Sequence, residues 1–512
     1  MMLAQVLSGA VLGIDAYLVK VEAHLAGGDP HFVTVGLPDG AVRESKVRVQ
    51  AAVKNSGYHF PPKKVTINLA PADIRKEGAA FDLPMAIGIL AALEYIKSDH
   101  LQEYVLLGEL SLDGSLRPIH GALPIAVCVA QQKVRGIILP EENAKEAAMA
   151  RDLRVIPARS LREAAQYLND ELDLSHFAMD MQKLFSSRRT YREDFSDVRG
   201  QQHVKRALEV AAAGGHNILM IGPPGSGKTM LAKRIPTILP DLTLEEALET
   251  TKIHSVAGLL PPHEALIATR PFGAPHHTIS DAGLIGGGNI PKPGEVSLAH
   301  HGVLFLDELP EFKKNVLEVM RQPLEDGRVT IARAMLSLTY PAEFMLAAAM
   351  NPCPCGYHTD PNNQCTCPPL MIQRYLARIS GPLLDRIDLH VEVPAVKFRE
   401  LAEQAAGEPS EAIRQRVAAG RRLQLERFSR HPRLFCNARM ESRDIRKYCR
   451  IDSRGEELLK SAITRWGLSA RAYDRILKVS RTIADLANSE LIQPEHVAEA
   501  IQYRSLDRSG IF

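Results

Sequence analysis

The feature that most constrains this chain is a glycine-rich stretch matching the phosphate-binding loop G-x-x-x-x-G-K-[ST]. Its residues are Gly222, Pro223, Pro224, Gly225, Ser226, Gly227, Lys228 and Thr229. The apolar run 217–221 precedes the loop and the helix-forming run 230–234 follows it, which is the strand–loop–helix context that such a loop requires. A glycine-rich turn that matches by chance is the alternative, and the flanking elements argue against it. The pattern predicts an α/β core that holds a nucleoside triphosphate.

Each part of the loop has a chemical role in this interpretation. The glycines let backbone N–H groups point at phosphate oxygens, and the following helix adds the positive end of its dipole. We expect Lys228 to reach the terminal phosphates and the Thr229 hydroxyl to ligate Mg²⁺. ATP and Mg²⁺ are therefore the predicted cofactors.

A second motif suggests hydrolysis in addition to binding. The apolar run Val303–Leu306 reads as a buried strand, and two acids, Asp307 and Glu308, follow it directly. We expect Asp307 to hold Mg²⁺ and Glu308 to orient and deprotonate the attacking water. Two acids at the end of a strand are often only a solvated loop, but here they share a predicted unit with the phosphate loop. The pair makes an ATPase the favoured interpretation.

Three more polar residues are candidates for the same site. A further apolar strand, 344–350, delivers Asn351 to its carboxyl end, where ligands of open α/β sheets gather, so Asn351 is the candidate sensor of the γ-phosphate. Arg386 lies between acids just before the strand 389–393 and is a candidate arginine finger for a neighbouring subunit, with a surface ion pair as the alternative. Arg471 opens the last long helix and is a candidate γ-phosphate contact from a lid.

Composition restricts the remaining possibilities. A length of 512 residues predicts about three domains. No apolar run approaches the roughly 20 residues that a membrane span needs. The N-terminus lacks the basic start and apolar core of a secretory signal, so a reducing cytoplasm without disulfides is expected. A net charge of +2 makes no global case for nucleic acid, and any basic surface must be local.

The distribution of patterns along the chain predicts four regions. Residues 1–170 alternate strands, such as 65–69, with helices, such as 83–93, and read as an α+β domain in which Asp113-Gly114 forms a hairpin turn. Further strands are expected at 136–140 and 153–157, around a helix that starts near Glu141. Residues 171–198 suit an exposed linker, 199–395 the ATPase core, and 396–512 an arginine-rich helical lid. An apolar stripe on the last long helix is expected to be core packing.

Taken together, the motifs resemble those of the AAA+ ATPases of the magnesium-chelatase-like group, specifically the bacterial YifB/ComM family. The segments that carry this resemblance are 197–202, the phosphate loop, 275–280, 299–308, 350–352 and 384–388. The resemblance implies a hexameric ring with composite ATP sites. It also implies that Arg386 is the finger, with Arg378 as the second choice, and that Arg471 is the sensor-2 arginine.

The same resemblance implies a function on DNA. ComM-type proteins are ATP-driven helicases that migrate branched DNA and help incoming single strands to integrate, by homologous recombination, during natural transformation. Two alternatives remain open: a magnesium-chelatase-type ATPase subunit that remodels a metal-insertion partner, and an AAA+ protein remodeller. The front domain, the cysteine cluster and the arginine-rich lid favour single-stranded and branched DNA as the partner.

The front domain resembles the proteolytic domain of the Lon family in segments 76–85 and 107–121. A Ser–Lys dyad does the chemistry in that family. In this chain Ala80 stands at the position matching the serine, and Leu123 or Pro124 at the position matching the lysine. The resemblance therefore implies the fold but no peptidase activity, and a scaffold or DNA-contacting role is expected.

Four cysteines, Cys353, Cys355, Cys365 and Cys367, lie together in a predicted insert at 353–367. Tetrahedral zinc is held by four thiolates on two tight loops, although the C-x-C spacing is tighter than the usual C-x₂-C. Zinc is the preferred interpretation, and free thiols in a polar loop are the alternative.

Two further segments are candidates for contact with DNA. The glycine-rich segment 281–292, which ends in Lys292, is expected to be a loop that could line a pore. The stretch 411–450 carries many cations, which could neutralise phosphates, although solvated helix faces and ion pairs between subunits explain arginines equally well. These cations are Arg414, Arg416, Arg421, Arg422, Arg427, Arg430, Arg433, Arg439, Arg443, Arg446, Lys447 and Arg450.

Overall fold

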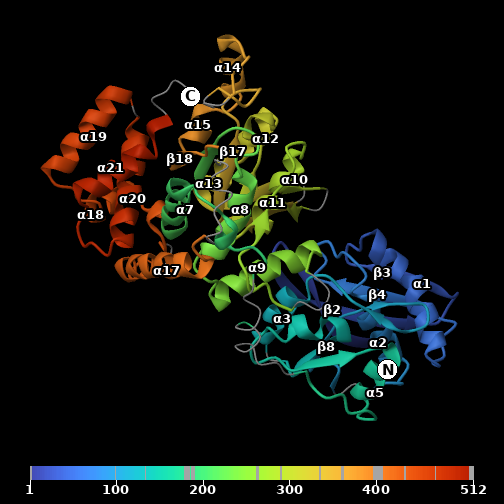
Figure 1. Ribbon diagram of the computed structural model, residues 1–512. Helices are drawn as coiled ribbons and strands as arrows, with labels where there is room; N and C mark the ends of the chain where they lie inside the picture. Colours follow the sequence, from blue (N-terminus) through green and yellow to red (C-terminus); the bar gives the residue numbers. More distant parts are fainter. Residues whose placement is uncertain are drawn as a thin grey trace. The chain divides into compact units, whose positions relative to one another are not determined.

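The computed structural model forms two compact units (Figure 1). The first unit contains Met1–Arg188 and Leu244–Ala268, and the second contains Arg189–Thr243 and Thr269–Phe512. The structure describes residues 3–97, 100–132, 134–177, 185, 191–260, 265–288, 291–333, 336–358, 363–395, 407–431, 434–467 and 469–506. Residues 178–184 and 186–190 of the predicted linker at 171–198 therefore lie outside the described residues.

The first unit is built on a mixed sheet of seven strands. In spatial order these are β3 (His31–Val35), β4 (Lys64–Ala70), β2 (Asp15–Ala26), β1 (Leu3–Leu12), β5 (Tyr104–Leu106), β8 (Gly136–Pro140) and β9 (Val155–Ala158). Strand β2 runs antiparallel to β1 and β4, and the remaining neighbours are parallel. The helices are α1 (Gly40–Asn55), α2 (Asp82–Ala92), α3 (Ala122–Ala130), α4 (Ala144–Ala147), α5 (Leu161–Leu168) and α9 (Leu244–Ala257). Helix α2 is apolar on nearly every face and packs on β1 and β2, which explains why it is almost wholly buried.

Several local predictions for the first unit are confirmed. Strands 65–69 and 136–140 and the helix at 83–93 are present, and Asp113-Gly114 turns between β6 (Glu109–Leu110) and β7 (Leu116–Arg117), with Gly114 at φ 88°. The helix expected near Glu141 is shorter than the pattern suggests. It is the 3₁₀ turn η2 (Glu141–Asn143) followed by the single turn of α4.

Helix α9 is an insertion into the first unit from the middle of the predicted ATPase core. It packs against α3, and the Ser255 hydroxyl donates to the Glu146 carboxylate, which also accepts the Leu123 N–H at 3.0 Å. Burial raises the pKa of Glu146, because three hydrogen bonds compensate only part of its lost hydration. The predicted core runs from 199 to 395 without interruption, whereas segment 244–268 folds with the first unit.

The second unit contains a parallel sheet of five strands. Their spatial order is β11 (Phe272–Gly273), β14 (Val303–Leu306), β17 (Met345–Met350), β10 (Ile218–Ile221) and β18 (Leu389–Glu392). Strand β10 comes first along the chain but lies between β17 and β18 in the sheet. Helices α7 (Gln202–Gly214) and α8 (Lys228–Ile238) contribute buried apolar side chains to the same core. All carboxyl ends of the strands meet at one edge, where ligands bind in open α/β sheets.

Short elements fill the connections of this unit. They are α10 (Asp281–Ile285), β12 (Gly286–Gly287), β13 (Lys292–Pro293), α11 (Glu295–Leu298), η4 (Leu309–Glu311), α12 (Lys314–Val319), α13 (Arg321–Asp326), β15 (Arg328–Arg333), β16 (Leu336–Pro341), α14 (Pro369–Leu376) and α15 (Gly381–Leu384). Segment 281–292 was expected to be a loop, but it starts as a helix capped by Ser280 and continues as a two-stranded pair, with Lys292 exposed. Asn289 and Ile290 of this segment lie outside the described residues.

A helical region, which we call the lid, follows the core. It comprises α17 (Ser410–Arg427), η5 (Asn437–Arg439), α18 (Ser442–Tyr448), α19 (Ser453–Trp466), α20 (Ala470–Leu486) and α21 (Pro494–Gln502), drawn in orange to red in Figure 1. Helix α20 packs against α7, α17 and α21. The predicted apolar stripe is buried at Ala472, Ile476, Val479 and Ile483, which confirms that it serves packing.

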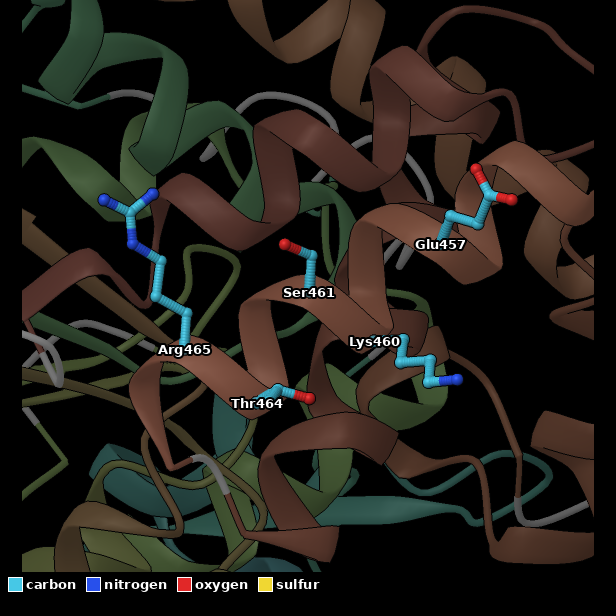
Figure 2. Close-up of a pocket in the computed structure, with 5 residues that line it drawn as sticks. All are labelled: Glu457, Lys460, Ser461, Thr464 and Arg465. Atoms are coloured by element: carbon cyan, nitrogen blue, oxygen red, sulfur yellow. The ribbon is translucent and has the colours of Figure 1, made fainter.

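A hollow of about 430 Å³ lies along α19 (Figure 2). Its lining residues are Glu457, Lys460, Ser461, Thr464 and Arg465. All come from one helix, so no groups from separate elements converge there, and no residue predicted to act on the nucleotide lines it. None of the helices that the structure describes has the length and apolar character needed to cross a membrane.

Candidate nucleotide site

The phosphate loop connects the end of β10 to the start of α8 in a conformation that depends on glycine. Gly225 (φ 76°) and Gly227 (φ 89°) are left-handed, a region that other residues adopt only at a cost. A Cβ atom on Gly222 would lie 2.1 Å from the Val393 carbonyl oxygen. Because the helix N-terminus follows directly, the loop presents backbone N–H groups beside a positive dipole end.

Lys228 lies buried at the centre of this loop. Its ammonium donates to the carbonyl oxygens of Gly222 (2.8 Å) and Pro223 (2.9 Å) and to Oδ1 of Asn351 (3.2 Å). Burial lowers the pKa of Lys228, and the carboxylates of Asp307 and Glu308 oppose that shift. The structure thus brings the predicted phosphate-binding lysine and the predicted sensor into direct contact.

The two oxygen ligands predicted for Mg²⁺ also meet. Thr229 Oγ1 donates to Asp307 Oδ2 at 2.7 Å, and the other Asp307 oxygen accepts the Glu308 N–H at 2.9 Å. A hydroxyl and a carboxylate are hard oxygen donors of the kind that Mg²⁺ prefers. Together with the glycine-lined loop, this donor set fits a magnesium–nucleotide complex. We call Lys228, Thr229, Asp307, Glu308 and Asn351 the catalytic edge.

Glu308 has an unusual backbone. Its φ of 53° is left-handed, a conformation that costs of order 1–3 kcal/mol for a residue other than glycine and tends to occur at functional sites. The His277 Nδ1 atom lies 3.3 Å from Glu308 Oε2, and the His277 ring packs beside that of His276 at 4.1 Å between centroids. His277 belongs to the predicted motif 275–280, but the sequence suggested no role for it.

Gln201 is a second contact that sequence reasoning missed. Its side-chain N–H₂ donates to the carbonyl oxygens of Ser226 (2.9 Å) and Pro394 (3.1 Å), which joins the phosphate loop to the segment after β18. Gln201 has φ 50°, and its Oε1 is a buried oxygen without a hydrogen-bond partner among the described residues. Its place in motif 197–202 was the only available signal.

The three predicted arginines lie apart from the catalytic edge. Arg386 is 8% exposed, and its guanidinium pairs with Glu325 of α13. Arg378 is 52% exposed and bonds Glu311 at 2.7 Å, while Arg471 is 64% exposed and lies 3.5 Å from Asp385. No interaction among the described residues joins any of the three to Lys228.

Motif 384–388 also anchors the lid. His216 Nδ1 lies 3.0 Å from Asp388 Oδ2, and its Nε2 lies 2.8 Å from Thr482 Oγ1 on α20. The second Asp388 oxygen pairs with Arg475 of the same helix. Burial opposes ionisation of Asp388, but Arg475 and His216 outweigh it and hold the pKa of Asp388 below its usual range.

The four clustered cysteines form a cage. Their sulfur atoms all lie within 4.8 Å of one another, and the closest pairs are Cys353–Cys355 at 3.3 Å, Cys355–Cys365 at 3.6 Å and Cys353–Cys365 at 3.7 Å. Zinc–sulfur bonds of about 2.3 Å in a tetrahedron require sulfurs about 3.8 Å apart. All seven cysteines are free thiols. Backbone N–H groups of Tyr357 and Thr366 lower the pKa of Cys355 to about 6, and residues 359–362 of the insert lie outside the described residues.

Comparison with known proteins identifies the family. Residues 194–401, 21–143 and 407–504 match the family models described as magnesium chelatase, subunit ChlI; subunit ChlI of Mg-chelatase; and magnesium chelatase, subunit ChlI C-terminal. Competence protein ComM of Haemophilus influenzae is 46% identical over 513 residues, which cover 99% of this chain and 98% of that protein. The chain belongs to the YifB/ComM family. An uncharacterized protein YifB of Escherichia coli is 44% identical over the same share of each chain.

YifB/ComM membership makes this protein a magnesium-chelatase-like AAA+ ATPase and indicates ATPase activity that uses ATP and Mg²⁺. A shorter similarity is to Lon protease 2 of Bacillus subtilis, which is 33% identical over 159 residues, 28% of this chain and 27% of that protein. In the first unit Ala80 is half-buried, Leu123 and Pro124 are buried at the start of α3, and the nearby Asp82 carboxylate pairs with Arg48 at 2.7 Å.

The lid of this YifB/ComM protein separates its arginines into two groups. On α17, Arg416 bonds Glu209 at 2.6 Å, Arg421 donates to the Ala213 carbonyl at 3.0 Å, and Arg427 pairs with Asp485. Arg414 is likewise paired, with Glu411. Ion pairs within the chain therefore hold Arg414, Arg416 and Arg427, and backbone carbonyl groups hold Arg421. Within the described part of the chain, no carboxylate pairs with Arg422, Arg430, Arg439, Arg443, Arg446, Lys447 or Arg450. Arg433 lies outside the described residues.

Proposed function

We propose that this protein is an ATP-hydrolysing DNA motor, a cytoplasmic hexameric ring that migrates branches during homologous recombination in natural transformation. One observation supports the proposal: Lys228, Thr229 and Asp307, the residues predicted to bind phosphate and Mg²⁺, lie together at the catalytic edge with the predicted base Glu308, in a chain whose relative is named a competence protein. Competence is the capacity of a cell to take up DNA. The unpaired cations of the lid support a polyanionic partner.

The residues of the catalytic edge divide the work of hydrolysis among them. Lys228 would bind the terminal phosphates, while Thr229 and Asp307 would hold Mg²⁺. Bound ATP supplies the phosphoryl group whose transfer to water releases the energy for movement. Glu308 would take the proton of that water, and Asn351 would sense the γ-phosphate. His277 is placed to orient the Glu308 carboxylate.

A second candidate is a chelatase-type ATPase subunit that remodels a metal-insertion partner, since the matching family models describe magnesium chelatase subunits. A general AAA+ protein remodeller is the third. ATP turnover measured with and without forked DNA separates them. The motor proposal predicts stimulation by DNA that weakens as salt rises. An ATP turnover rate that is the same with and without DNA, together with no salt-sensitive binding of single strands, would reject the motor proposal.

The ring proposal requires an arginine that acts across a subunit interface. Arg386 matches the family finger but would have to leave Glu325, whereas Arg378 is exposed without rearrangement. Mixing two inactive variants distinguishes them. A Lys228→Ala copy can lend its finger to an Arg386→Ala copy, so turnover should recover in the mixture if Arg386 acts in trans. If only the mixture with Arg378→Ala recovers, Arg378 is the finger. No recovery in either mixture would reject composite sites.

We also propose that the cysteine cage holds one structural zinc ion per chain. The sulfur spacings support it, and the ion would fix the insert that follows Asn351. Purified protein should contain about one zinc equivalent, and the Cys353→Ser variant should contain almost none. Less than half an equivalent in protein purified without chelator would favour free thiols.

For the first unit we propose a non-proteolytic, Lon-like scaffold that could contact DNA. Ala80, Leu123 and Pro124 offer neither a nucleophile nor a base at the dyad positions. Casein incubated with the protein and ATP should stay intact. ATP-stimulated cleavage would refute this part of the proposal.

A further inference from the structure

Helix α18 of the lid carries a compact set of exposed cations. Arg446 and Lys447 lie three and four residues after Arg443, so the three share one face of the helix, and Arg450 is exposed just past its end. We call these four residues the α18 basic face. The residues between them, Ile445 and Cys449, are buried against the lid core.

The helix gains little from this arrangement. Like charges three and four residues apart repel one another and destabilise a helix. Arg446 and Lys447 lie near the helix C-terminus, where the dipole favours cations, but Arg443 lies in the first turn, where it does not. A role in folding therefore does not account for the whole set.

The acids nearest in sequence serve other groups. Glu441 and Asp444 form a capping box with the backbone N–H groups at the start of α18, and Asp452 accepts the Gly455 N–H at the start of α19. Within the described part of the chain, no ion pair joins a carboxylate to the α18 basic face. Among the residues that the structure describes, Lys447 lies over the Tyr448 ring, 4.6 Å from its centroid. The guanidinium groups of Arg416, Arg421 and Arg427 on α17, in contrast, are held by acids and carbonyls from other elements.

We infer that the α18 basic face binds the phosphate backbone of DNA, an assignment that rests on the proposed function and adds a contact surface to it. Cations with Cβ atoms about 5–6 Å apart along a helix face suit a line of phosphates, which long flexible side chains can follow without reading bases. Such a face contributes affinity that depends on salt and not on sequence.

The test compares the affinity for labelled forked DNA, duplex DNA and single strands over a range of salt concentrations. The full-length Arg443→Ala/Arg446→Ala/Lys447→Ala variant should bind more weakly. Its slope of log affinity against log salt should be about 3 units shallower than that of the wild-type protein, roughly one unit for each lost phosphate contact. Whether duplex or single-stranded DNA shows the larger loss identifies which strand arrangement the face contacts.

Two matched variants control for trivial effects. Lys460→Ala/Arg465→Ala removes cations from α19, on the hollow shown in Figure 2, and should keep the wild-type slope. The Arg443→Lys/Arg446→Lys variant keeps the positive charges, so its slope of log affinity against log salt should stay close to that of the wild-type protein. An equal thermal midpoint in all variants shows that the lid is folded.

The outcomes distinguish failure of the inference about the α18 basic face from failure of the DNA-motor proposal. If the wild-type protein shows salt-dependent DNA binding and the triple variant has the same slope, the inference fails while the motor proposal stands. If the triple variant forms an assembly of different mass but keeps the wild-type slope of log DNA affinity against log salt, the face contacts another copy of the chain and the inference fails. If the wild-type protein shows no salt-dependent binding of DNA, both fail.

Discussion

The catalytic edge and the lid both depend on charged side chains, but different features of the sequence bring these side chains to their partners. At the catalytic edge, Asp307 and Asn351 directly follow parallel strands and Lys228 follows one after a short loop, so three short motifs bring these groups together. In the lid, an arginine is paired or free according to residues far away in the sequence, as Arg427 and Asp485 illustrate. The same residue type serves hydrolysis, packing or surface charge, and only its surroundings distinguish these roles.

This comparison leads to four expectations, and the largest effect belongs to the catalytic edge. Glu308→Gln keeps the shape of the side chain but removes the base, so ATP turnover should fall about 1,000-fold, within the range typical of general-base removal. ATP binding and the thermal midpoint should stay close to wild type. Glu318→Gln changes a half-buried acid on α12 that pairs with Arg321; it is the control and should keep its turnover. Wild-type turnover in Glu308→Gln would place the base elsewhere.

The next largest effect concerns stability alone. Asp485 is fully buried and joins Arg427 and Arg481, so Asp485→Ala leaves two guanidinium groups without their shared partner. Breaking a buried pair in this way costs about 3–5 kcal/mol. Urea unfolding should show that loss. A loss below about 1 kcal/mol would mean that the lid does not depend on its internal ion pairs.

A smaller effect should appear in acid. The pKa of Asp388 in the folded protein lies below the value of about 3.9 expected when unfolded, so its contribution is present above pH 4 and disappears as the pH falls towards the folded value. Each unit of lowering corresponds to about 1.4 kcal/mol. The free energy of unfolding of Asp388→Asn should therefore depend less on pH below pH 4 than that of the wild-type protein. Equal slopes for the two proteins would show that Asp388 does not anchor α20.

The smallest effect on stability should follow from changing an exposed cation of the α18 basic face. Arg446→Ala removes an exposed side chain that pairs with no carboxylate among the described residues, and its unfolding free energy should change by less than about 0.5 kcal/mol. The same urea titration measures it. A change as large as that of Asp485→Ala would mean that Arg446 holds the lid together.

The sequence predicts the parts of this molecule whose geometry is local. The phosphate loop, the strand with its two acids and the position of Asn351 all follow from runs of a few residues, because a strand end fixes where the next side chain lies. The contact between His277 and Glu308 did not follow, since it joins two connections of the sheet whose approach depends on the fold.

The insertion of α9 into the first unit shows a second limit. Its residues are only weakly amphipathic, and nothing in their spacing indicates that Ser255 bonds Glu146, more than a hundred positions earlier. A partner at that separation cannot be read from periodicity, which reports only which residues share a face. The division between paired arginines, such as Arg427, and arginines that pair with no carboxylate among the described residues, such as Arg446, escaped prediction for the same reason.

The account makes one central claim, that hydrolysis at the catalytic edge moves DNA. The most direct measurement follows the branch point of a three-stranded DNA substrate in the presence of the wild-type protein, the Glu308→Gln variant, ATP or a non-hydrolysable analogue. The account predicts that the branch moves only with the wild-type protein and ATP, while the Glu308→Gln variant still binds the substrate. A branch that stays in place while the wild-type protein hydrolyses ATP would contradict the claim.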